Sequence, residues 1–139
     1  MRKMITTLFV VLMLLSSSVV SAECNLDTTR WRWVGSDSST GVFYDRKTFK
    51  FLNNGLVELW TCQYHPNSCD EFSGEHYHYI LTRLNFNENL IGGKVYLVRN
   101  SYGKIIDNQS YRDFSYSPVL PNSVGEALFF AVRQDVFGK

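Results

Sequence analysis

Alternating apolar and polar side chains recur along much of the chain after residue 30, a pattern that predicts β-strands. Lys94–Arg99 shows it clearly, with Val95 and Leu97 on one face and Tyr96 and Val98 on the other. The other segments with strand character are 31–34, 42–45, 48–52, 56–63, 75–86 and 104–106, the last followed by a polar stretch to residue 117. Because short connections join successive strands antiparallel, we expect an antiparallel sheet of five to six strands arranged as a meander.

Short runs of Gly and Asn separate these segments and predict turns. The Asn-Asn-Gly run at 53–55 is typical of a hairpin, because Asn and Gly tolerate a positive φ. Gly92 and Gly93 are predicted to belong to a connection in the same way. Pro118 is predicted to end the sheet, since proline cannot donate to a strand ladder.

The last part of the chain has helical spacing instead. Apolar residues recur at positions 124, 127, 128, 131, 132 and 136 and form one stripe. Ser123 and Glu126 match the capping box that begins many helices, and Gly138 is typical of a helix end. The sequence therefore predicts an α+β fold, in which one C-terminal helix packs against the sheet.

This helix is too short to shelter the whole sheet. A helix of about 15 residues is roughly 22 Å long and covers only part of one face. Several strands nevertheless carry apolar groups on both faces, as with Tyr77 and Tyr79 against Ile80 and Leu84. Three arrangements satisfy this pattern: a strongly bent sheet that buries both faces, a second subunit, or a patch that binds a partner.

Residues 1–22 have the pattern of a secretory signal peptide. Arg2 and Lys3 precede the apolar run 8–15, and Val20-Ser21-Ala22 supplies small residues for cleavage. The apolar run is shorter than the ~20 residues that span a bilayer. We therefore expect an exported protein, in the periplasm, at the cell surface or secreted, whose domain covers residues 23–139 and has no membrane span after cleavage.

The charge of the predicted domain argues against nucleic acid as a partner. Without Arg2 and Lys3 the chain has 12 basic and 13 acidic side chains, which gives a net charge of −1. Binding to nucleic acid depends on clustered Lys and Arg that neutralise phosphates, and the sequence has no such cluster. The composition is compatible with a protein partner.

Three cysteines become relevant once export is expected, because disulfides persist outside the cytoplasm. Cys62 and Cys69 are predicted to pair, which closes the short loop CQYHPNSC and leaves Cys24 over. Pairing of Cys24 with either of the others is the alternative. Such a short link is expected to stabilise the fold by a few kcal/mol at most, about what loop-closure entropy allows.

The same region holds the densest group of metal-binding side chain types. His65, His76 and His78 are candidate metal ligands, and Cys62 and Cys69 would complete a tetrahedral zinc set if they stayed reduced. Oxidation to a disulfide removes both sulfur ligands, so the sequence favours the disulfide and predicts no cofactor.

The sequence shows none of the motifs that serve hydrolases. Neither a G-x-S-x-G elbow nor an H-E-x-x-H helix is present. Asp70, Glu71 and Glu75 lie close to His76 in the sequence, and a solvated acidic loop explains them as well as an acid–base cluster does. We expect a protein that is not an enzyme.

Four aromatic residues are candidate contacts for a binding partner. Trp31, Trp33, Tyr77 and Tyr79 lie on predicted strands, and amphipathic rings make good anchors at interfaces. Packing in the core is the alternative for each of them.

Three segments resemble the surface-adhesin protein E family of small exported bacterial domains. They are RWRWVGSD running into VFYDRKTFK, then LVELW, and finally SPVLPNSVGEALFFAV, in the same order between residues 30 and 132. The resemblance implies an antiparallel sheet with a C-terminal helix and a role in binding host matrix proteins.

The sequence thus predicts a non-enzymatic exported domain that binds a host matrix protein or a cell-envelope protein. The first alternative is a structural or accessory periplasmic domain that forms a homodimer through the bare sheet face. The second is an exported metal-binding protein.

Overall fold

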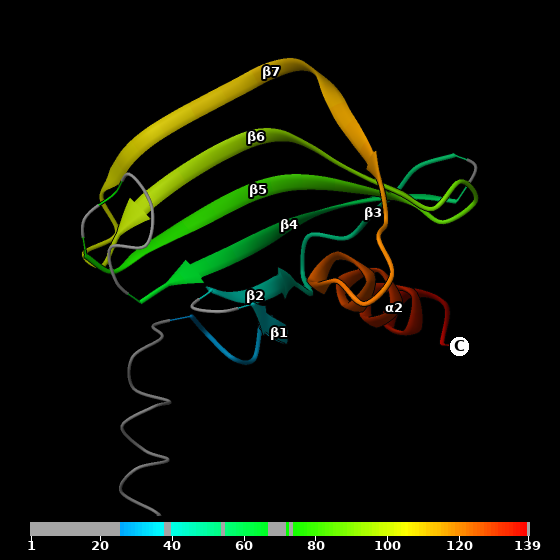
Figure 1. Ribbon diagram of the computed structural model, residues 1–139, viewed down its shortest axis with the longest axis horizontal. Coiled ribbons are helices and arrows are strands. Elements are labelled where there is room, and N and C mark those ends of the chain that lie inside the picture. The colour runs from blue at the N-terminus through cyan, green and yellow to red at the C-terminus, as the bar shows by residue number, and fades with distance from the viewer. Residues whose placement is uncertain (1–25, 38–39, 54, 67–71, 73, 139) are drawn as a thin grey trace, which may run out of the picture.

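One antiparallel sheet forms the body of the protein, and a helix lies against its concave side (Figure 1). The computed structural model describes residues 26–37, 40–53, 55–66, 72 and 74–138. The elements are β1 (Trp31–Asp37), β2 (Thr40–Asp45), β3 (Lys50–Phe51), β4 (Leu56–His65), β5 (His76–Asn85), β6 (Leu90–Asn100), β7 (Ile105–Pro118) and α2 (Val124–Phe137). The predicted signal peptide lies outside the described residues.

The strands follow one another through the sheet as a meander, in the order β1-β2-β4-β5-β6-β7, and all pairs are antiparallel. The short strand β3 pairs with β4 beyond the end of β2, which raises the number of described strands to seven. The predicted fold class is confirmed. The number of strands is higher than the expected five to six, and the segments 42–45 and 48–52, which the sequence allowed to be two strands or one interrupted strand, belong to two separate strands, β2 and β3.

Strand β7 corrects the prediction for the polar stretch after residue 106. It continues to Pro118 and pairs with β6 on both sides of an irregularity, since Val95 is opposite Ser110 and Gly93 is opposite Ser115. Most of its side chains are exposed. An edge strand of this kind needs no apolar alternation, which is why the sequence pattern did not reveal it.

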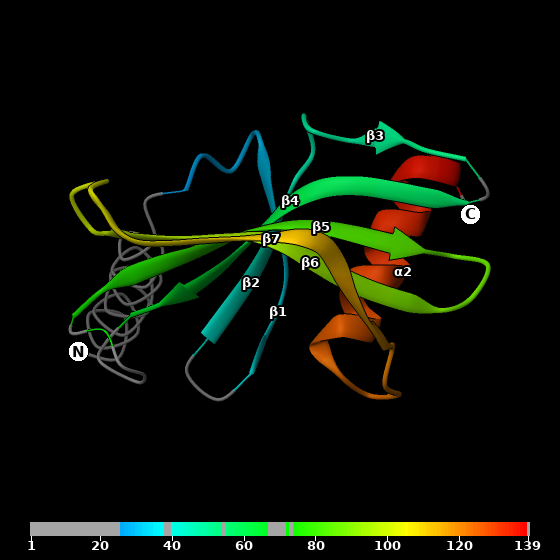
Figure 2. The same cartoon turned by 90° about the horizontal axis from the view of Figure 1, so that it is seen from above.

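The main core lies between α2 and one face of the sheet, here called the helix face. Val57 and Leu59 of β4 and Leu84 of β5 are almost completely buried there. From α2 they meet the buried residues Leu128, Phe129 and Val132. Figure 2 shows that α2 covers the sheet near the start of β4, away from its end at His65.

The helix begins and ends as the sequence predicts. Ser123 accepts a hydrogen bond from the amide of Glu126 at 3.1 Å, and Gly138 adopts a left-handed conformation at φ 68°. The predicted apolar stripe needs one correction, because Ala127 is exposed and Phe129 is buried in its place. Phe129 packs on Phe86, with ring centroids 4.5 Å apart.

A polar contact fastens the last turn of α2 to the first two strands. The buried Tyr44 of β2 donates to Oδ2 of Asp135 at 2.6 Å, and Arg32 of β1 donates to Oδ1 at 2.9 Å. Burial raises the pKa of Tyr44 to about 12, and the contact with Asp135 adds to that effect. The phenol therefore stays protonated and keeps donating well into the alkaline range.

A second polar contact fixes the start of β1. Arg30 donates to both carboxylate oxygens of Asp45, at 2.8 and 2.6 Å, and the amide of Lys47 donates to the same carboxylate. Burial raises the pKa of Asp45, but these hydrogen bonds outweigh burial and hold the pKa below its usual value. The carboxylate is thus charged and paired although the residue is fully buried.

Candidate functional site

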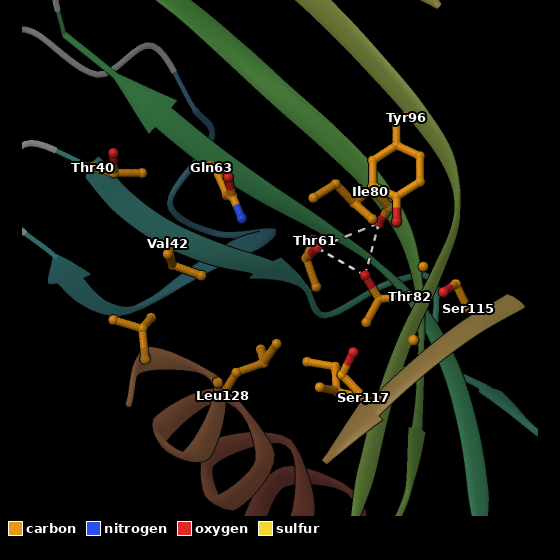
Figure 3. Close-up of a pocket in the computed structure, with 15 residues that line it drawn as sticks. Thr40, Val42, Thr61, Gln63, Ile80, Thr82, Tyr96, Ser115, Ser117 and Leu128 are labelled. Atoms are coloured by element: carbon orange, nitrogen blue, oxygen red, sulfur yellow. Dashed lines mark hydrogen bonds between the residues drawn. The ribbon is translucent and has the colours of Figure 1, made fainter. Parts of the chain in front are cut away.

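A pocket of about 450 Å³ opens on the helix face, beyond the part of the sheet that α2 covers (Figure 3). Its floor comes from β2, β4, β5 and β6, and its walls come from β7 and the first turns of α2. The volume lies in the range of sites for small molecules or inserted side chains. The pocket therefore has the size of a binding site.

The described residues that line this pocket are all uncharged. Aliphatic side chains such as Ile80 and Leu128 alternate with hydroxyl and amide groups such as Thr61, Gln63 and Ser117. Among the lining residues that the structure describes, none is Asp, Glu, Lys, Arg or His. An uncharged ligand would meet matching surfaces in this part of the pocket.

Two buried hydroxyl groups give the floor a fixed shape. Thr61 of β4 and Thr82 of β5 are both buried, and their Oγ1 atoms lie 2.9 Å apart. Thr82 also donates to the carbonyl oxygen of Ile80 at 3.1 Å, as Figure 3 shows. These bonds satisfy both hydroxyls within the sheet, so the floor is rigid before any ligand arrives.

Gly92 and Gly93 correct another prediction, because they lie within β6 and not in a turn. Both are buried at places where a side chain would collide with a tyrosine. A Cβ on Gly93 would collide with the hydroxyl oxygen of Tyr96, and a Cβ on Gly92 would lie 2.7 Å from Cδ1 of Tyr116. The glycines thus let tyrosine rings lie across the strand, and Tyr96 borders the pocket for this reason.

The three candidate metal ligands meet at the end of the helix face that is remote from α2. His65 ends β4, and His76 and His78 belong to the start of β5. One ring nitrogen from each lies within 4.8 Å of those of the other two. His65 and His76 are buried and His78 is half-buried. The cluster borders the pocket, because Thr40 lines the pocket and its Oγ1 lies 3.3 Å from Nδ1 of His65.

Cys62 does not join these histidines. It is buried on the opposite face of the sheet, where it packs with Tyr64 and Tyr77. Positions 62 and 65 are three apart, and residues at odd spacing on a strand point to opposite faces. A zinc set that combines Cys62 with the histidines is therefore wrong. The predicted partners Cys69 and Cys24 lie outside the described residues, as do Asp70 and Glu71, so the disulfide stays a prediction.

The four aromatic candidates lie on the face opposite to the pocket. Trp31, Tyr77 and Tyr79 pack in the same cluster as Cys62, and the rings of Trp31 and Tyr79 are 5.6 Å apart. Trp33 is different, since 58% of it is exposed. Of the four, Tyr77 is buried, Trp31 and Tyr79 are half-buried, and Trp33 has the ring that is largely exposed.

Sequence patterns did not reveal the pocket residues Thr61, Gln63, Thr82 and Tyr96. Threonine and tyrosine are ordinary strand residues, so their types give no signal. One signal in the sequence could have indicated the pocket. On the helix face of β4, the apolar residues Val57 and Leu59 are followed by the polar residues Thr61 and Gln63. That change marks the place at which the sheet leaves the cover of α2.

Within the described residues, no helix has both the length and the apolar character needed to cross a bilayer. Comparison of the chain with protein-family models, with curated proteins and with solved structures finds no match. The case for a function therefore rests on the geometry of the helix face and on the resemblance carried by the sequence.

Proposed function

We propose that this protein is a non-enzymatic, exported binding domain that resembles the surface-adhesin E family. In this proposal, the pocket on the helix face binds an uncharged segment of a protein partner. The single observation that supports the proposal is that every described residue lining the pocket is uncharged. A charged ligand would lose its hydration there without gaining an opposite charge. Aliphatic side chains of a partner could pack against the apolar residues of the pocket, and hydroxyl-bearing side chains could form hydrogen bonds with its polar residues.

The edge strand β7 suggests how a partner segment would reach the pocket. Among the described strands β7 is the last in the sheet, so its outer side has no neighbouring strand. Ser115 and Ser117 of β7 also line the pocket. An extended segment paired with β7 would direct alternate side chains towards the helix face, which is the usual way in which a peptide is added to a sheet edge.

Capture of partners by the purified protein tests the proposal. The protein is offered extracellular matrix proteins and cell-envelope proteins, each as a purified sample, and binding is measured by surface plasmon resonance. The variant Ser117→Arg places a charge at the pocket on an exposed strand position, where it should leave the fold intact. We expect affinity for the partner to fall at least about tenfold, because the bound partner would bury the introduced charge without pairing it.

Ser110→Arg is the matched control. It introduces the same charge on the same strand, but Ser110 pairs with Val95, which lies on the face opposite to the pocket. Its affinity should equal that of the unmodified protein. Equal binding by both variants, or no binding to any candidate at about 10 μM protein, would contradict the proposal.

A further inference from the structure

The fold gathers every histidine of the chain at one point. The sequence contains three histidines, and all three belong to the cluster at the outer end of the helix face. His65 and His76 are direct cross-strand partners, and His78 lies two residues further along β5 on the same face. Two adjacent, hydrogen-bonded strands thus fix the backbone positions of all three histidines.

The rings are close enough to share one ion. The ring centroids of His65 and His76 are 4.8 Å apart with planes 3° from parallel, and His78 lies 4.6 Å from His65 and 5.1 Å from His76. Nitrogens that bind one tetrahedral zinc at 2.0–2.1 Å lie about 3.3 Å apart. The present separations of up to 4.8 Å therefore require an approach of at most about 1.5 Å, which changes in the side-chain torsion angles can supply.

Hydrogen bonds already orient two of the rings for such a role. Nδ1 of His76 lies 2.7 Å from the carbonyl oxygen of Gly74, and a carbonyl can only accept, so Nδ1 carries the proton. In the neutral ring, Nε2 then holds the lone pair that a metal needs. Nδ1 of His65 contacts the hydroxyl of Thr40, and outer contacts of this kind commonly fix the rings of metal-bound histidines.

We infer that His65, His76 and His78 form a binding site for a divalent transition metal of the zinc type. Imidazole nitrogens suit Zn²⁺, Cu²⁺ and Ni²⁺ and are poor ligands for Mg²⁺ or Ca²⁺. Three nitrogens leave a fourth position for water or for an oxygen donor. Phe72 packs 5.6 Å from His76 and 5.7 Å from His78 and gives one side of the cluster an apolar cover. The site is independent of the proposed function, although it borders the same pocket.

Calorimetric titration with Zn²⁺ tests this inference on untagged protein freed of metal by a chelator. We expect one zinc ion per chain. Because the chain has only three histidines, a long-range ¹H–¹⁵N spectrum of the imidazoles reads the site directly, and all three sets of ring signals should shift together with zinc. Mg²⁺ at the same concentration should leave these signals in place.

Two variants and a control locate the ion. His76→Ala and His78→Ala should each weaken zinc binding about 100-fold or more, since loss of even an outer contact to a metal ligand costs 10–100-fold. His78 is half-buried, so His78→Ala keeps the test valid if loss of the fully buried His76 prevents folding. Ile80→Ala is the matched control, because Ile80 lies two residues further along the same strand and face and carries no ligand.

Each result separates the metal site from the pocket. Ile80→Ala alters the pocket lining and should keep zinc binding, whereas His78→Ala should lose zinc and keep the affinity for a protein partner. No heat of binding with Zn²⁺, Cu²⁺ or Ni²⁺, or undiminished zinc binding by a folded His78→Ala variant, would overturn the inference.

Discussion

The two ends of the helix face follow the same strand alternation and have opposite characters. At the end beneath α2, the positions of β4 and β5 that point to the helix face hold Val57, Leu59 and Leu84, and all three are buried. At the other end the same positions hold Gln63 and the three histidines. Strand alternation thus decides which face of the sheet a side chain points to. Whether that position must be apolar depends on whether α2 packs over it.

The largest expected effect comes from truncating one position at each end. Leu84→Ala empties a fully buried site under α2 and should lower the free energy of unfolding by about 2–5 kcal/mol. Ile80→Ala, four residues away on the same strand and face, should cost only about 1–2 kcal/mol, because Ile80 is half-buried and the space left behind opens to the pocket. Urea denaturation with a common m-value measures both. Equal losses would show that the two ends do not differ in packing.

An intermediate effect is expected at the buried carboxylate of Asp45. Asp45→Asn should lower the free energy of unfolding by about 1–3 kcal/mol, since Arg30 loses its charged acceptor but is 43% exposed and regains water.

The pH dependence gives this change a sign. The pKa of Asp45 is lower in the folded protein than its usual 3.8, so the stabilisation is complete above that value and is lost as the pH falls through the folded pKa. Urea midpoints measured between about pH 5 and pH 2 should therefore fall less steeply for Asp45→Asn than for the unmodified protein. Parallel curves would show that the Asp45 contact does not contribute to acid sensitivity.

The smallest effect is expected where the helix end meets β2. Tyr44→Phe removes one hydrogen bond to Asp135 and should cost about 1 kcal/mol, because Arg32 continues to hold that carboxylate. Burial raises the pKa of Tyr44 to about 12, so its contribution is present below the usual value of 10.0 and disappears as the pH rises towards 12. The difference in melting temperature between the two proteins should shrink over that range. A constant difference would mean that the phenol does not titrate as proposed.

Local signals in the sequence were enough to predict the sheet and the helix. Periodicity two is strong on β4 and β5, and Ser123, Glu126 and Gly138 mark both ends of α2 by their own chemistry. Strand β7 and the glycines of β6 were missed for one shared reason. Their conformation depends on neighbouring strands, since Gly92 and Gly93 are explained only by the tyrosine rings that lie across them.

The candidate site was predicted only in part. His76 and His78 share a face through their spacing alone, but the meeting of His65 with His76 depends on the register between β4 and β5. Cys62 shows the opposite error, because nearness in sequence suggested a partnership that the strand geometry forbids. The pocket itself could not be predicted, since it exists where α2 ends its cover of the sheet.

The contact between α2 and β1 has a consequence for the order in which the chain can fold. Arg32 and Asp135 are 103 positions apart, so β1 and α2 can meet only after the residues between them have been made. Until then no helix covers the aliphatic row of β4 and β5, and that row stays exposed to other chains. Contacts over such long sequence separations tend to slow folding, so we expect a newly made chain to need protection until α2 can pack against the sheet.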